Sequence, residues 1–80
     1  MSGFSPEDAM AMEQRHILEG EKRIARQEAL VRELIEQGHT SIVQRSIELL
    51  DAMRASLELT KERLKDLETR YPKTPRAEPD

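Results

Sequence analysis

Several residue types are missing or scarce in this chain of 80 residues, and each absence narrows what the chain does. It has no cysteine, which excludes disulfides, thiolate nucleophiles and cysteine-ligated zinc. Aromatic residues make up only 2 %, which is a poor fit to a compact fold with a large mixed core. No stretch approaches the roughly 18 apolar residues of a membrane span, and the N-terminus lacks the basic and apolar regions of a signal peptide. We therefore expect a cytoplasmic protein that does not contact membranes.

An excess of basic residues is also missing, since the formal net charge is −3. No basic face is available for a phosphate backbone, so we do not expect a nucleic-acid partner. A helix-turn-helix over residues 35–50 is a weaker alternative, because the flanking helices are far longer than that motif needs. There is no glycine-rich phosphate loop, Ser/His/Asp set or zinc-ligand spacing. We therefore expect no enzyme, no cofactor and no small-molecule substrate.

The charged residues that are present, 36 % of the chain, suit long solvated helices. Ser5 followed by Pro6 predicts a helix start, because the serine hydroxyl can cap free N–H groups and proline fits the first helical position. No proline interrupts the following thirty or so residues, and Gly38 is the residue expected just past a helix C-terminus. The first helix therefore ends near Gln37.

A second helix follows at once. Thr40 or Ser41 is expected to cap it, and Ser41 with Gln44 has the S-x-x-Q spacing of a capping box. Such a short connection between long helices favours an antiparallel return. The expected fold class is therefore all-α, an antiparallel two-helix hairpin resembling a coiled coil. Its expected divisions are a disordered N-terminus (1–4), a helix (5–37), a turn (38–40), a helix (41–71) and a disordered proline-rich tail (72–80).

Apolar residues recur along both helices at heptad spacing, which predicts the surface on which they meet. The first helix carries them at Met10, Ile17, Ile24, Val31 and Ile35, with Gly20 and Leu34 beside this stripe and Glu13 and Gln27 as polar interruptions. In the second helix the two heptad positions are filled by Val43, Leu50, Leu57, Leu64 and Tyr71 and by Ser46, Met53, Thr60 and Leu67. A reversal near His39 and Thr40 predicts the pairs Val31–Leu50, Ile24–Leu57, Ile17–Leu64, Met10–Tyr71 and Gly20–Thr60.

One such surface leaves many apolar side chains uncovered, and ordering about sixty residues costs more than a thin core returns. The uncovered residues are Leu18, Leu30, Ile42, Ile47, Leu49 and Leu59. We expect two hairpins to pair as a homodimer, a four-helix bundle, or one hairpin to dock on the helices of another protein.

A metal site is the alternative with chemical content. Glu13 and His16 have the Glu-x-x-His spacing that puts a carboxylate and an imidazole one turn apart, and the expected pairing brings Glu68 near Glu13. Against it, the four-residue match is common in glutamate-rich helices, and Arg15 adds a repelling charge. A solvated helix flank is the more ordinary interpretation, so we assign no metal ligand.

The string His16, Gly20, Glu21, Arg23, Ile24 and Gln27, followed by Gly38-His39-Thr40, resembles a group of short uncharacterised proteins of alphaproteobacteria. Their pattern runs H-x-x-x-G-E-x-R-I-x-x-Q, then G-H-x-T, and the match covers about residues 13–67. In that group the turn is commonly Gly-His-Asp-Thr, whereas here Thr40 and Ser41 follow His39. The resemblance implies a cytosolic bacterial protein with no known activity, and no catalytic residue carries over.

Together these observations predict a small non-catalytic module that binds a protein partner or a second copy of itself. The alternative is a metal-binding helical bundle that uses Glu13, His16 and Glu68. The sequence does not identify the partner.

Overall fold

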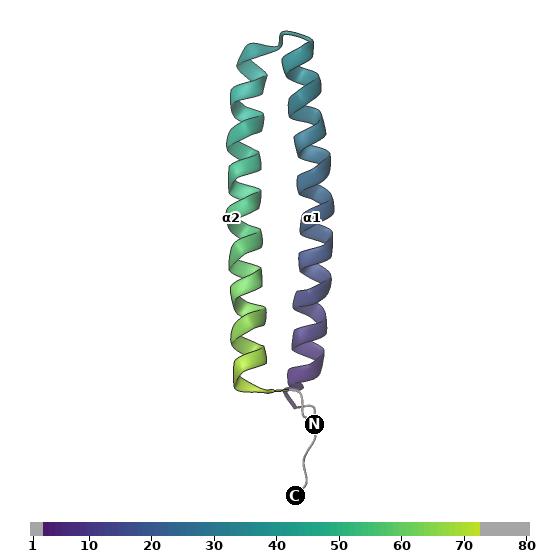
Figure 1. Ribbon diagram of the computed structural model, residues 1–80, viewed down its shortest axis with the longest axis vertical. Coiled ribbons are helices and arrows are strands. Elements are labelled where there is room, and N and C mark those ends of the chain that lie inside the picture. The colour runs from purple at the N-terminus through teal and green to yellow at the C-terminus, as the bar shows by residue number, and fades with distance from the viewer. Residues whose placement is uncertain (1–2, 73–80) are drawn as a thin grey trace, which may run out of the picture.

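The computed structural model describes residues 3–72, which form two long helices lying side by side. Helix α1 (Pro6–Glu36) and helix α2 (Thr40–Arg70) have 31 residues each and run antiparallel over their whole length (Figure 1). Each is therefore about 46 Å long. No strand occurs in the described part of the chain. The expected all-α hairpin is confirmed, whereas the tail from residue 73 on, with its expected disorder, lies outside the described residues.

The start of α1 is as predicted. Ser5 is the N-cap, its hydroxyl oxygen accepts a hydrogen bond from the Asp8 backbone N–H at 3.3 Å, and Pro6 is the first helical residue. Just before the cap, the Phe4 ring lies 5.7 Å from the ring of Tyr71, the residue that ends α2. Aromatic pairs at this separation attract one another. The start of α1 and the end of α2 are therefore in contact at the open end of the hairpin.

The turn between the helices depends on Gly38. Its φ of +77° lies in the left-handed region, where a side chain is strained. The Gly38 N–H donates to the Ile35 carbonyl at 3.1 Å, and the His39 N–H donates to the Leu34 carbonyl at 3.0 Å. This pair of bonds is a Schellman motif, which satisfies the last carbonyls of α1. The predicted chain reversal at Gly38 is confirmed.

The predicted cap of α2 is wrong. The N-cap is His39, and the described residues supply no side-chain hydrogen bond to the first turn of α2. Thr40 is already helical, and its hydroxyl donates to the Gly38 carbonyl at 3.4 Å. The cause is the tightness of the turn. Because His39 closes the Schellman motif of α1 and also begins α2, Ser41 falls inside the helix and is not available as its cap.

The contact surface of α2 follows the predicted heptads. Every predicted position from Val43 to Leu67 is buried or half-buried, while Tyr71 is exposed. The matching surface of α1 differs in one position, since Ile35 is exposed and Leu34 occupies the surface instead. The reason is the alternation of three and four residues along a helix face, which leads from Val31 to Leu34. Residues of α1 on this surface are Met10, Glu13, Ile17, Gly20, Ile24, Gln27, Val31 and Leu34.

The alignment of the two helices also differs from the prediction. A Cβ atom at Gly20 would lie 3.1 Å from the Leu57 Cδ1 atom, so the residue facing Gly20 is Leu57 and not Thr60. The Gln27 side chain donates from Nε2 to the Ser46 carbonyl at 3.0 Å, which ties the helices together nearer the turn. The expected pairing assumed a reversal near Thr40, but α2 has already begun there.

The core between two helices is thin. Val31 and Leu50 are its buried apolar residues, and Ser46 and Thr60 are buried with them. No side chain in residues 3–72 is fully enclosed. Two helices cover each other on one side only, so most apolar side chains keep part of their surface in water. Within the same residues, neither helix combines the length and apolar character that crossing a membrane requires.

Candidate functional site

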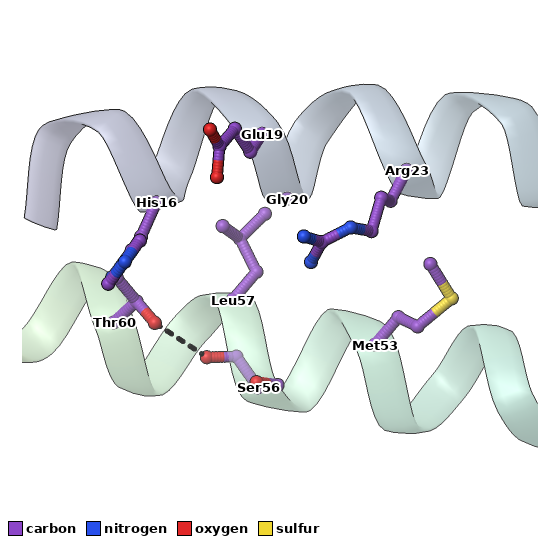
Figure 2. A pocket seen from close by; sticks show the side chains of 8 residues that line it. All are labelled: His16, Glu19, Gly20, Arg23, Met53, Ser56, Leu57 and Thr60. Carbon is purple, nitrogen blue, oxygen red and sulfur yellow. Dashed lines mark hydrogen bonds between the residues drawn. The ribbon is translucent and has the colours of Figure 1, made fainter.

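A groove runs along one side of the contact surface where Gly20 leaves space. It has a volume of about 390 Å³ and lies between both helices near their middle. Figure 2 shows the Leu57 side chain reaching from α2 towards Gly20. The groove is lined by His16, Glu19, Gly20 and Arg23 of α1 and by Met53, Ser56, Leu57 and Thr60 of α2.

The Thr60 hydroxyl, which lines this groove, is engaged within the hairpin. The Thr60 hydroxyl donates to the Ser56 carbonyl at 3.2 Å, as Figure 2 shows, and accepts from the Arg63 Nη2 atom at 3.4 Å. A hydroxyl that donates to its own helix is held away from the role of nucleophile, because that role needs the proton to face a base. The Thr60 hydroxyl is therefore occupied within its own helix.

Glu13 lies on the contact surface beside the groove. Its Oε1 atom is 3.8 Å from the His16 Nδ1 atom, and its Oε2 atom is 3.7 Å from the Arg63 Nε atom. Only 17 % of the Glu13 side chain is exposed, and the buried Oε1 atom has no hydrogen-bond partner among the described residues. The Glu13 carboxylate is removed from water without gaining a strong partner, so it lowers the stability of the packing between the two helices.

The third expected metal ligand does not join this pair. Glu68 lines a different depression together with Glu7, Met10, Ala11, Gln14 and Tyr71. Within residues 3–72, no group of three His, Asp or Glu side chains is placed to hold a metal ion. The cause is the alignment of the helices. Arg63, not Glu68, comes from α2 to meet Glu13, and a cation there repels a metal ion.

The opposite side of the contact surface is charged. The Arg54 Nη2 atom lies 2.6 Å from the Glu28 Oε2 atom, which joins the two helices, and the Lys61 Nζ atom lies 3.4 Å from the Glu58 Oε2 atom. We call this side the charged flank, defined by Glu21, Ala25, Glu28, Arg54, Glu58 and Lys61, which surround one shallow depression with Ile24 and Leu57. Exposed pairs of this kind contribute about 0.2–1 kcal/mol each and keep the flank in water.

The α2 side that borders the groove is different in character. Ile42, Leu49 and Leu59 are 50 %, 53 % and 57 % exposed. With Arg45, Ala52 and Ser56 between them at steps of three and four residues, they share one face of the helix. We call this face the apolar flank, defined by Ile42, Arg45, Leu49, Ala52, Ser56 and Leu59. Ser56 places the flank at the edge of the groove.

The residues expected to remain uncovered are found exposed, with one exception. Leu18, Leu30, Ile42, Leu49 and Leu59 all keep two fifths or more of their surface in water, whereas Ile47 is half-buried. The spacing of apolar residues in the sequence did not distinguish the charged flank from the apolar flank. The signal that does so is the contrast between Arg54 and Lys61 on one side of α2 and Leu49 and Leu59 on the other.

Comparisons of this chain with protein-family models, curated proteins and solved structures found no match.

Proposed function

We propose that this chain is a non-catalytic interaction module that binds another helical surface through its apolar flank. The observation that carries the proposal is the row formed by Ile42, Leu49 and Leu59, each exposed by half or more in a hairpin whose described side chains are never fully enclosed. Contiguous exposed apolar surface marks interaction sites in soluble proteins. Covering a half-exposed Leu or Ile contributes on the order of 1 kcal/mol.

The geometry favours a helix as the bound element. The residues of the apolar flank, spaced by three and four along α2, form a straight ridge against which the ridge of a second helix fits. Ala52 and Ser56 interrupt the ridge with small side chains, so a partner backbone can approach closely there. A phosphate backbone has less to bind, because Arg45 is the one charged residue of the flank. The cytoplasmic bacterial setting implied by the resemblance to alphaproteobacterial proteins is part of this proposal.

Two single-cysteine variants test it cleanly, since the chain has no cysteine of its own. Ala52→Cys puts a thiol on the apolar flank, and Ala25→Cys puts one at an exposed position of the charged flank. The rate of thiol labelling is measured with purified protein across a concentration series, and again in extract of the cells that produce it. We expect labelling of Ala52→Cys to slow by about tenfold or more in at least one condition, because a docked helix excludes reagent. Labelling of Ala25→Cys should stay constant. Equal rates for both variants throughout would refute the proposal.

A further inference from the structure

We propose that Met53 is a site of reversible oxidation by peroxides and that its sulfoxide loosens the hairpin. The proposal concerns the groove beside Gly20 and does not depend on what binds the apolar flank. Met53 lines this groove and also belongs to the contact surface of α2. The same thioether is therefore within reach of a small oxidant and part of the packing between the two helices.

Methionine carries all the sulfur of this chain, which has four methionines and no cysteine. Peroxides oxidise proteins at the sulfur of cysteine and methionine, so here the oxygen goes to methionine. Three of the four lie in residues 3–72. Met12 is 47 % exposed and lies off the contact surface, whereas Met10 and Met53 are half-buried on it. Oxidation at Met12 therefore leaves the packing between the helices unchanged, and oxidation at Met10 or Met53 alters it.

The groove makes the Met53 thioether accessible while the hairpin is folded. Figure 2 shows the Met53 side chain reaching from α2 towards α1, on the same side of the groove as Arg23. The groove has a volume of about 390 Å³. A water molecule occupies roughly 30 Å³ in the liquid, and hydrogen peroxide is larger by one oxygen atom, so the groove has room for it. Oxidation of Met53 therefore does not have to wait for unfolding.

The reaction is the transfer of one oxygen atom. The lone pair of the sulfur attacks one oxygen of the peroxide, an S–O bond forms and the O–O bond breaks. The sulfur loses two electrons and the peroxide gains them. With hydrogen peroxide, the proton on the transferred oxygen passes to the departing hydroxide, which leaves as water. Methionine sulfoxide is reduced again by methionine sulfoxide reductases, so the change is reversible.

A sulfoxide at this place is unfavourable because of what Met53 packs against. Leu57 faces Gly20, so Met53, one turn before Leu57, is level with Ile24, one turn after Gly20. Both Met53 and Ile24 are half-buried on the contact surface. A flexible apolar thioether suits this place, whereas the sulfoxide has a polar oxygen that an isoleucine side chain cannot hydrogen-bond. Because the core between the helices is thin, losing one apolar contact weakens the whole hairpin.

Met10 is the other methionine of the contact surface, but its position reduces the effect of oxidation there. It lines the depression that Tyr71 borders, at the open end of the hairpin. Helix ends open locally at little cost, so a polar group is accommodated there by fraying. Met53 lies near the middle of α2, where the helices must separate for the sulfoxide to reach water. We therefore assign most of the destabilisation to Met53.

Melting curves of peroxide-treated protein test the site. The purified chain is treated with hydrogen peroxide, mass spectrometry locates the sulfoxides, and circular dichroism at 222 nm follows unfolding. We expect oxidation to lower the melting temperature by about 4–8 °C, and treatment with methionine sulfoxide reductases to restore it. Met53→Leu keeps the size and apolar character of the side chain and should remove most of this loss. Met12→Leu is the matched control and should show the full loss.

Met53→Gln tests the same effect without an oxidant. Glutamine is about as long as methionine and, like the sulfoxide, has a polar oxygen near the end of its side chain. We expect Met53→Gln to lower the melting temperature by about as much as oxidation does, whereas Met12→Gln should leave it unchanged. A Met53→Gln chain as stable as the wild type would overturn the destabilising role of a polar group at this position.

The rate of oxidation tests the access that the groove provides. In the folded chain we expect Met53 to be oxidised within about tenfold of the rate of Met12, and the two rates to become equal in urea. Oxidation of Met53 more than about a thousandfold slower than that of Met12 would show that only the unfolded chain reacts. An equal loss of melting temperature in wild type and Met53→Leu would overturn the assignment to Met53.

Discussion

Replacing Gly20 with alanine should stabilise the hairpin, although two effects oppose each other at this position. Glycine inside a helix costs about 0.8–1.0 kcal/mol relative to alanine, so the substitution gains that amount from backbone entropy. Against it, the new Cβ atom would lie 3.1 Å from the Leu57 Cδ1 atom, which is tighter than ordinary van der Waals contact. The sign of the change depends on whether Leu57 can move.

The structure indicates that it can. The contact is to the far end of a flexible side chain, Leu57 is half-buried, and the groove of about 390 Å³ beside it is open. A shift of a few tenths of an ångström needs only a small side-chain rotation, well short of the 30° that costs about 0.5–1.5 kcal/mol. We therefore expect Gly20→Ala to raise the free energy of unfolding by about 0.5–1 kcal/mol, which is about 2–8 °C in melting temperature. Gly20→Leu should lower it by about 1–3 kcal/mol, because a whole side chain does not fit against Leu57.

Urea unfolding followed by circular dichroism at 222 nm measures both changes, at one protein concentration because association adds to apparent stability. Ala55→Gly provides the control. Ala55 is exposed in the middle of α2, so this variant measures the helix-propensity effect alone and should lose about 1 kcal/mol. If Gly20→Ala destabilises by more than about 1 kcal/mol while the control behaves as expected, the reasoning is wrong and the helices need a bare backbone at Gly20.

Four further changes are predicted. Leu50→Ala should lower the free energy of unfolding by about 2–3 kcal/mol, because Leu50 is one of the buried apolar residues of a thin core; a loss below about 1 kcal/mol in urea unfolding would contradict this packing. Glu13→Leu should raise it by about 1–2 kcal/mol, since it removes a mostly buried carboxylate with an unpartnered oxygen, and a destabilised variant would show that the contacts of Glu13 are worth more than its desolvation costs. Gly38→Ala should cost about 1–2 kcal/mol through its φ of +77°, and an unchanged melting curve would argue against the left-handed turn. Zn(II) or Fe(II) at equimolar concentration should leave the melting temperature unchanged, because among residues 3–72 no third His, Asp or Glu side chain joins Glu13 and His16; a rise that His16→Ala abolishes would restore the metal-binding alternative.

Local chemistry made much of the fold predictable. The start of α1 follows from Ser5 and Pro6, and the turn follows from Gly38, because capping and a left-handed backbone depend on a few adjacent residues. The contact surface of α2 follows from heptad spacing, which is a property of one helix. The cap of α2 was the exception, because the turn proved one residue tighter than expected and His39 took part in both helix ends.

The candidate site was less predictable, because it depends on how one helix is aligned against the other. In the structure, α2 is displaced along α1 by about one helical turn from the predicted alignment. Leu57 therefore lies over Gly20, Arg63 lies near Glu13, and Glu68 lines another depression. Heptad spacing repeats along the helix, so several alignments bury nearly the same apolar residues and the pattern alone does not choose among them.

By itself, the sequence determined that this chain is two helices, where each begins and ends to within about a residue or two, and that a glycine reverses the chain between them. Only the tertiary structure decided the alignment of the helices and the partners of Glu13. The physical reason is that helices and turns depend on residues that are neighbours in the chain. The choice among nearly equivalent alignments depends instead on residues that meet between the two helices, such as Gly20 with Leu57 and Gln27 with Ser46.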